Sequence, residues 1–397
     1  KALSIVGATT VLYFSFILIG IGYQLLNGYT RIELDVYLLD FLYDKLPIYL
    51  VWSGFMIFIQ VMVNNKYIGY FISILIIFIW EIVLSVADVQ SNMLSIGGGP
   101  SLTYSDLNGF GPGVLGKLWF NVYWILFSAV CILLAGILWV RGNSVVLKER
   151  IFNARKKIPK TYFRVLTVLF VLWIATAGFV YYNTQVLNPY KSSDQYEEMA
   201  VEYEKTYKKY QNVNLPKTTN VKYQIDIFPN ERDLKVQAQL TYTNQSQKPI
   251  DSLHYTIDED WNPEFNIPNS KLVFEDENFG YLIYQLSPAL QPGESMDIEI
   301  TTSYITKGFE NQTGNTSIVK NGTFINNFSI LPTLGYNESI ELSDKNKRKK
   351  FDLKPKDRMP ELEENCSANC MANYLSNGQS DYINVETIIS TSSNQIA

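Results

Sequence analysis

Few residues of this sequence are of the types that carry out catalysis or bind metals. His254 is the only histidine among 397 residues, so the chain can form neither a pair of histidine ligands nor an HExxH zinc helix. Cys131 lies in an apolar run, where we expect a buried packing residue, and Cys366 and Cys370 form a Cys-x3-Cys pair. Without further ligands, incidental thiols or one local disulfide outside the cytoplasm are preferred over a metal site. We predict no catalytic, cofactor-binding or metal-binding residue here.

A glycine-rich stretch imitates a nucleotide-binding motif. Gly111-x4-Gly116-Lys117 has the spacing of a phosphate loop, but Leu118 stands where Ser or Thr would hold magnesium, and no buried strand precedes it. We reject it as a nucleotide site. No other Walker pattern occurs, so any ATPase must be a separate chain.

The 397 residues divide into two halves of different composition. Up to Tyr190 the chain has 13 Lys/Arg and 8 Asp/Glu, a net charge of +5; from Lys191 onward it has 20 Lys/Arg and 30 Asp/Glu, a net charge of −10. This division excludes an ordinary globular enzyme. Five segments of the first half are long and apolar enough to cross about 30 Å of hydrocarbon. They run from Leu3 to Leu26, Leu46 to Val63, Tyr67 to Val86, Leu118 to Val140 and Phe163 to Tyr182.

The orientation of these spans follows from one basic loop. Eight Lys or Arg side chains lie between residues 141 and 164, against the single Glu149, and the positive-inside rule places this loop in the cytoplasm. The loop from Asp88 to Lys117 and everything after Tyr182 then lie outside. We expect an inner-membrane protein with an extracytoplasmic C-terminal part.

Glu81 is the one ionisable residue inside a predicted span, and a carboxyl at that depth costs about 3 kcal/mol on insertion scales. The functional interpretation is a substrate or coupling site. The structural one, which we favour, is a hydrogen-bonded packing residue near the outer surface.

The second half is typical of water-soluble β structure. The pattern from Asp194 to Tyr210 predicts an exposed helix with a stripe of aromatic side chains on one face. We expect this stripe to cover the next domain or the membrane interface; docking of a partner is a less favoured alternative. After Pro216 the period changes to two, which predicts short strands in an antiparallel sandwich or saddle-shaped sheet. The first two strands, near 221–227 and 234–242, are joined by the turn Pro229–Arg232 and form a β-hairpin. Further strands run near 253–257, 272–274, 281–286 and 296–304. We expect transmembrane helices over 1–182, a linker with the exposed helix over 183–216, and a β-domain over 217–397.

Two further features of the second half have plain structural interpretations. His254 has no facing nucleophile, so a surface or packing role is preferred. The basic run from Lys345 to Lys350 is flanked by acidic residues, so we expect a solvated loop and no nucleic-acid partner.

Two signatures in this chain resemble parts of known families. Tyr104 to Gly111, ahead of an apolar span, resembles the outer loop of bacterial type-2 ABC exporter permeases, which singles out Tyr104, Ser105, Asp106, Asn108 and Gly109. The second half, from Val221–Pro229 through Leu290–Glu294 to Tyr304, resembles the opening β-domain of gluzincin zinc aminopeptidases. Asn321–Asn337 and Ser390–Ala397 resemble the form of that domain in permease–aminopeptidase fusions.

The resemblance implies a membrane α-helical bundle of about five spans followed by an extracytoplasmic all-β sandwich or saddle domain. It also implies the bacterial inner membrane, a separate ATP-binding cassette ATPase, and a second copy or paired permease subunit. In that family the Gly-x-Met-x-Asn loop and the HExxH zinc helix follow the β-domain, and this sequence stops before both. Both ends look cut, so we expect zinc only in a longer parent, of which this chain covers the last spans and the N-terminal β-domain.

Two hypotheses of different classes follow. In the first, the chain is the middle of a permease fused to a zinc aminopeptidase whose catalytic part is absent here, so the chain itself has no peptidase activity and no stoichiometric zinc. In the second, it is a non-enzymatic, membrane-anchored binding or assembly platform. A sensor that signals through the last span is a weaker third hypothesis.

Overall fold

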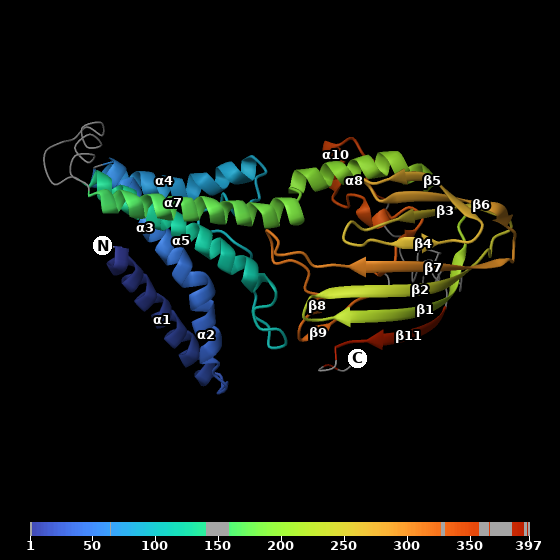
Figure 1. Cartoon of the computed structure of the whole chain (residues 1–397), viewed down its shortest axis with the longest axis horizontal. Coiled ribbons are helices and arrows are strands. Elements are labelled where there is room, and N and C mark those ends of the chain that lie inside the picture. The colour runs from blue at the N-terminus through green and yellow to red at the C-terminus, as the bar shows by residue number, and fades with distance from the viewer. Residues whose placement is uncertain are drawn as a thin grey trace. The chain divides into compact units, whose positions relative to one another are not determined.

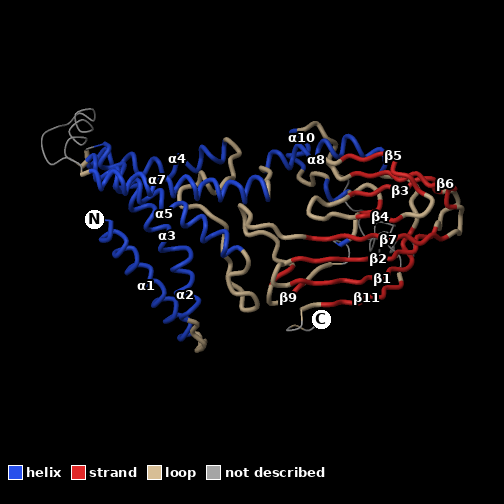
Figure 2. Tube along the Cα trace, viewed as in Figure 1, coloured by secondary structure: helices blue, strands red, loops and turns tan. Residues whose placement is uncertain are grey.

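The computed structural model describes residues 2–63, 65–139, 159–326, 330–356, 365, 383–392 and 395. The chain forms two compact units, one of residues 1–192 together with 307–316, the other of residues 193–306 and 317–397. Long helices build the first unit and β-strands dominate the second (Figures 1 and 2). The Cys366/Cys370 pair and the basic segment 141–157 lie outside the described residues.

Five helices of the first unit are long and apolar enough to cross a membrane, as the sequence predicted. The helices are α1 (Ala2–Leu26), α2 (Leu34–Asp40), α3 (Leu46–Val63), α4 (Lys66–Val86), α5 (Gly113–Leu138) and α7 (Lys160–Tyr181). Two π-helical turns, η1 (Phe41–Lys45) and η2 (Tyr182–Leu187), extend α3 and α7. The second candidate span therefore runs over Leu34–Val63 and the fifth over Lys160–Leu187. Both are longer than predicted, because charged and polar residues at their ends continue the helix instead of ending it.

Helices α3, α5 and α7 form the packed centre of this unit. Gly54 of α3 lies directly against the Ser128 hydroxyl of α5, which donates a 2.9 Å hydrogen bond to the carbonyl of Leu50. Small residues at a helix crossing allow this approach, the usual way in which membrane helices associate. Phe120, one of the buried aromatics at this centre, is fully buried. Cys131 is also buried, which confirms the prediction of a packing residue.

The second unit is a β-sandwich. One sheet has the order β11-β1-β2-β7-β4 and the other the order β10-β3-β6-β5. The strands are β1 (Lys217–Phe228), β2 (Asp233–Thr243), β3 (Ile250–Thr256), β4 (Glu264–Asn266), β5 (Ser270–Asp276), β6 (Tyr281–Leu290), β7 (Ser295–Tyr304), β10 (Thr333–Leu334) and β11 (Asn384–Ser390), with a small β8 (Ile318–Val319) and β9 (Gly322–Thr323) pair. The predicted β1–β2 hairpin and its turn are confirmed. The first sheet is mixed, however, because β11 runs parallel to β1.

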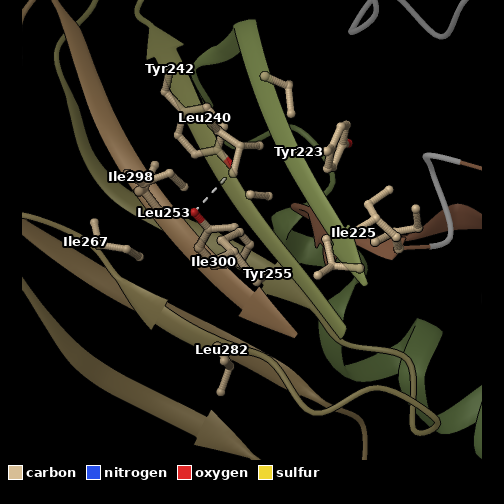
Figure 3. Close-up of a cluster of buried hydrophobic side chains, with 14 of the residues drawn as sticks. Tyr223, Ile225, Leu240, Tyr242, Leu253, Tyr255, Ile267, Leu282, Ile298 and Ile300 are labelled. Atoms are coloured by element: carbon tan, nitrogen blue, oxygen red, sulfur yellow. Dashed lines mark hydrogen bonds between the residues drawn. The ribbon is translucent and has the colours of Figure 1, made fainter. Parts of the chain in front are cut away.

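Alternating side chains of the two sheets meet in one core (Figure 3). Val221 pairs with Leu240 and Ile225 with Val236 across β1 and β2, and all four side chains are buried. The hydroxyl of Tyr255 on β3 donates a 3.4 Å hydrogen bond to that of Tyr242 on β2, so the two sheets also share a polar contact.

Helix α8 (Ser193–Tyr207) and the 3-10 turn η3 (Lys208–Tyr210) belong to this second unit. Tyr203 and Tyr207 are fully buried and pack with Tyr281 of β6, whereas Tyr196 is exposed. The aromatic stripe therefore covers the β-domain, which is one of the alternatives that the sequence left open.

The prediction of a solvated loop at the basic run was wrong. Residues Lys345–Lys350 form the short helix α10, and the side chain of Asp344 caps it by accepting from the backbone amides of Asn346 and Lys347. Arg348 of this helix is 2% exposed. The number of charged residues in this run could not show which side chain is buried in the sandwich unit.

Candidate functional site

Glu81 lies five residues before α4 ends at Val86. Its carboxylate accepts a 3.0 Å hydrogen bond from the Ser95 hydroxyl, and the indole of the neighbouring Trp80 donates to the carbonyl of Leu94 at 2.8 Å. The two side chains thus hold the 87–112 loop to the end of α4. This geometry supports the structural interpretation of Glu81, and the alternative of a substrate or coupling site stays a hypothesis.

The permease-like residues 104–109 form a tight surface turn. The carbonyl of Ser105 accepts from the amide of Gly109 at 2.7 Å, and the reverse bond measures 2.8 Å. Gly109 has a φ of +57°, a conformation that favours glycine. Tyr104 packs edge-on against Phe110, which in turn meets Tyr43 of η1. Asp106 is exposed and Asn108 is half-buried. The structure therefore places these five residues in one surface turn.

An ion pair between a buried lysine and a half-buried aspartate joins η1 to α5. Lys117 is 4% exposed, and its ammonium lies 2.6 Å from the Asp44 carboxylate. Lys45 approaches the other oxygen of the same carboxylate at 2.6 Å. The amide of Asn121, one turn after Lys117, donates to the carbonyl of Tyr43 at 2.7 Å. Single π-helical turns are frequent at functional sites, and here the turn is held to α5 at two points.

A ten-residue strap, residues 307–316, completes the first unit although it lies between β7 and β8 in the sequence. Asn311 anchors it: the residue is 1% exposed, its amide donates to the carbonyl of Gln90 at 2.9 Å, and its side-chain oxygen accepts from the backbone amide of Asn92 at 3.0 Å. The carbonyl of Asn92 accepts in turn from the indole of Trp124 on α5 at 3.2 Å. Asn311 therefore bridges the strap, the 87–112 loop and, through Asn92, α5.

Aromatic contacts, a glycine and two polar side chains hold the rest of the strap against the helices of the first unit. Phe309 is buried between Phe120 of α5 and Phe179 of α7, with ring centroids 6.5 and 5.9 Å away. Gly116 has no side chain, which leaves room for Phe309. The Asn188 side chain donates to the carbonyls of Lys307 and Phe309 at 2.6 and 3.2 Å. At the far end the hydroxyl of Thr313 donates to the carbonyl of Ser101 at 2.7 Å.

Replacing Gly308 with alanine should loosen the strap. Gly308 has a φ of +55°, and a Cβ there would collide with the side-chain oxygen of Asn183 in η2. The left-handed conformation alone costs a non-glycine residue about 1–2 kcal/mol. We expect faster amide hydrogen exchange in residues 307–316, measured by mass spectrometry. The matched change is Gly322→Ala, where no atom lies within 4 Å of the added methyl. Equal exchange in the two variants would contradict the expectation.

The sequence did not predict the Asp44–Lys117 pair, although a signal was present. The predicted topology places the start of the second span and the start of the fourth at the same side of the membrane. Asp44 and Lys45 directly precede the second span, and Lys117 directly precedes the fourth, so a carboxylate and an ammonium group from the two starts could meet. For the strap no such signal existed, because Asn311 is separated by 219 residues from its partner Asn92.

A second polar cluster lies inside the sandwich unit. The guanidinium of Arg348 contacts both carboxylate oxygens of Glu204 on α8 at 2.8 Å, and Glu341 lies 3.8 Å away. Lys208 bridges the same two carboxylates at 2.8 and 3.1 Å. Burial raises the pKa of Glu204, but the hydrogen bonds from Arg348 and Lys208 outweigh it and hold the pKa below its ordinary value. The i,i+4 spacing of Glu204 and Lys208 can be read from the sequence, whereas their contacts with Arg348 and Glu341 cannot.

His254 is a packing residue, one of the two roles that the sequence left open. It is 4% exposed, its Nδ1 lies 3.0 Å from the hydroxyl of Tyr281, and its ring packs against Tyr210 of η3. Burial lowers its pKa from 6.5, while the nearby Asp251 acts in the opposite direction and is the weaker influence.

The sandwich unit should lose stability as the pH falls below 6.5. The pKa of His254 is lower in the folded than in the unfolded chain, so its contribution is present above pH 6.5 and is lost as the pH falls through the folded value. Glu204 and Glu341 add a second loss below pH 4.5, because their folded pKa values are also lowered. The test follows amide exchange in β2 and β7 from pH 7.5 to 4, corrected for intrinsic rates. His254→Gln should remove the loss that begins below pH 6.5 and should leave the loss below pH 4.5 in place; an unchanged curve would contradict this assignment.

Neither polar cluster combines a nucleophile with a base. Among the described residues, no group of three or more His, Cys, Asp or Glu side chains could hold a metal ion. The expectation that zinc belongs to a longer parent stays a prediction.

Comparisons with known proteins give limited similarity. No protein-family model matches the sequence, and no curated protein matches it. Among solved structures, the chain is similar to an M1 zinc metallopeptidase from Deinococcus radiodurans, with 13% identity over 24% of this chain and a TM-score of 0.19. A mutant of that enzyme bound to a tyrosyl-seryl-alanine substrate matches 23% of this chain at 13% identity and a TM-score of 0.18. The chain spans 21% of each of those structures, and the overlap is too small to carry an argument on function.

Proposed function

We propose that this chain is the membrane-helix part and the extracytoplasmic β-domain of a bacterial ABC-type exporter permease, fused in its parent to a zinc aminopeptidase. The observation that carries the proposal is the joining of five membrane-length apolar helices to a β-sandwich in one chain. The turn at residues 104–109, which resembles a permease loop, adds support from the sequence.

The distribution of charge supports an extracytoplasmic position for the sandwich. The basic residues concentrate between the fourth and fifth spans, and the sandwich follows the fifth. The 87–112 loop and the start of α5 then belong to the outer side. With no nucleotide motif in this chain, a separate ATP-binding cassette ATPase would drive export, and a second copy or a paired permease subunit would complete the pathway.

In the parent, bound zinc would polarise the scissile carbonyl and the attacking water. The described residues of this chain offer no ligand set for it. In this proposal the sandwich supports the catalytic part of the parent. This chain alone should hydrolyse no aminopeptide substrate.

The second candidate is a non-enzymatic binding or assembly platform. A cavity of about 410 Å³ favours it, since this cavity opens on the sheet that contains β1, β2 and β7. Its lining includes Lys222, Gln239, Thr241, Asp297 and Glu299, a polar set that could bind a polar partner without catalysis.

Cysteine labelling tests the orientation. In a background with Cys131, Cys366 and Cys370 changed to serine, Thr103→Cys and Gln247→Cys should react with a membrane-impermeant maleimide in intact spheroplasts. Ser144→Cys should react only after permeabilisation, because it lies in the basic segment. The reverse pattern would overturn the topology and with it the exporter proposal.

Isolation from native membranes separates the two candidates. The permease proposal expects an ATP-binding cassette ATPase to co-purify, and an intact mass far above the 45.5 kDa of this chain with about one zinc per parent. The hypothesis of a binding or assembly platform predicts a species of 45.5 kDa that co-purifies with neither an ATPase nor zinc.

A further inference from the structure

A cavity of about 410 Å³ lies against three adjacent strands of the first sheet, β1, β2 and β7 (Figure 1). Lys222, Gln239 and Glu299 line it, one from each strand. Each of the three lies between two buried neighbours on its own strand, so its side chain points to the opposite face, away from the core. The cavity therefore opens on the outer, polar face of the sheet.

The cavity has opposite charges at its two sides. Lys222 of β1 pairs in register with Gln239 of β2, which pairs with Glu299 of β7. Asp297 precedes Glu299 by two positions on β7 and faces the same way, so this side has two carboxylates. Neighbouring strands lie about 4.8 Å apart, which separates the cationic strand from the acidic strand by roughly 10 Å. A ligand that matches both sides must carry two opposite charges at about that distance.

The contacts of these charged groups leave them able to bind a ligand. Lys222 lies 3.1 Å from Glu386 of β11, but the two side chains are 56% and 63% exposed, so solvent screens this ion pair. A carboxylate of a ligand can therefore compete with Glu386 for the ammonium group. On the acidic side the hydroxyl of Thr241 donates a 2.7 Å hydrogen bond to the carboxylate of Asp297. This bond orients the carboxylate toward β2, the middle strand of the cavity.

A short peptide with free ends matches this arrangement. A single amino acid carries both of its charges on one carbon atom and cannot reach both sides of the cavity. An extended tripeptide spans about 10 Å at roughly 3.3 Å per residue, so its ammonium and carboxylate groups have the required separation. Between them, the side-chain amide of Gln239 can both donate to and accept from a peptide bond. A neutral oligosaccharide would leave both charged sides unmatched.

We propose that the cavity on the outer face of β1, β2 and β7 binds a short peptide with a free amino terminus and a free carboxyl terminus. The peptide lies across the strands, with its ammonium group at Asp297 and Glu299 and its carboxylate at Lys222. This proposal names a class of partner for the hypothesis of a binding platform and rests on that hypothesis for its biological use. The exporter proposal does not depend on it.

Ligand-observed NMR titration of the full chain in nanodiscs tests the site. The probes are tri-alanine, N-acetyl-tri-alanine, tri-alanine amide and the neutral oligosaccharide triacetylchitotriose. Tri-alanine should bind at millimolar concentration. Loss of either terminal charge should weaken binding at least about threefold, the size expected for one exposed charge contact. The oligosaccharide should bind more weakly than tri-alanine.

Two substitutions assign the ends of the peptide. Lys222→Met should weaken tri-alanine at least about threefold but leave the affinity of tri-alanine amide unchanged, because the amide lacks the charge that Lys222 contacts. Glu299→Gln should likewise weaken tri-alanine and leave N-acetyl-tri-alanine unchanged. Lys235→Met is the matched control. Lys235 is exposed on the same face of β2 but lies outside the described lining of the cavity, so its replacement should change no affinity.

Three results would overturn the proposal. The first is no binding of tri-alanine at millimolar concentration. The second is an affinity for triacetylchitotriose equal to or above that for tri-alanine, which would make the cavity a site for neutral polar ligands. The third is an equal loss for tri-alanine and its amide in Lys222→Met, which would mean that the lysine does not contact the carboxylate. Unchanged amide hydrogen exchange in the centres of β2 and β7 verifies that each variant is folded.

Discussion

Arg348→Met should lower the free energy of unfolding of the sandwich unit by about 3–5 kcal/mol, one of the two largest effects that we expect from a single substitution. Removal of the guanidinium leaves Glu204 and Glu341, 4% and 7% exposed, without their buried cation, and only the partly exposed Lys208 among the described residues still bridges them. Methionine fills most of the volume, so the loss comes from the carboxylates that have lost their buried partner and not from a cavity. The slowest amides of β2 and β7 report this free energy in the full chain.

Lys350→Met is the matched control for Arg348→Met. It lies on the same helix α10, and its ammonium pairs with Asp194 and Glu197 on α8 at 3.2 and 3.3 Å. Its side chain is 55% exposed, so solvent screens these pairs and their loss should cost less than about 1 kcal/mol. Equal effects of the two substitutions would show that Arg348 is held no more strongly than a surface charge.

The double variant Glu204→Gln/Arg348→Met tests the reason given. Since it removes one of the stranded charges, it should be more stable than Arg348→Met alone. Recovery should be partial, because Glu341 stays buried beside the methionine, although Lys208 and Lys356 still contact it. A double variant less stable than Arg348→Met would contradict this account of the cluster.

Local patterns predicted the parts of the fold that depend on neighbouring residues. The five apolar spans and the β1–β2 hairpin follow from composition and period, because their side chains face lipid or one core over a continuous stretch. β4 was missed since three residues give no period. β11 was missed because its partner β1 lies more than 150 positions earlier in the sequence and runs parallel to it.

The polar contacts could not be predicted in the same way, because each depends on two distant residues. The basic run at 345–350 was interpreted by its charge, yet Arg348 turns inward to Glu204, 144 positions earlier. Asn311 lies in a segment without periodicity, and its importance derives from Gln90 and Asn92. The predicted topology places Asp44 and Lys117 at the same side of the membrane. This restricts the possible partners of each charge and could have led to the pair.

Leu253→Ala should lower the free energy of unfolding of the sandwich unit by about 2–5 kcal/mol. Leu253 lies on β3, is fully buried, and points into the core formed by both sheets (Figure 3). Truncation removes apolar contacts and leaves a cavity. The two sheets cannot close this cavity without breaking backbone hydrogen bonds between their strands. The neighbouring Tyr255–Tyr242 hydrogen bond should persist, since it belongs to adjacent positions of the core.

The same substitution at Leu272 provides the control for the core. Leu272 lies on β5 of the same sheet and is 38% exposed, so its replacement by alanine should cost less than about 1 kcal/mol. Exchange of the slowest amides in β2 and β7 again gives both values, and amides of α5 should stay unchanged because they belong to the other unit. If Leu253→Ala cost no more than Leu272→Ala, the two sheets would not share the single close-packed core on which the sandwich depends.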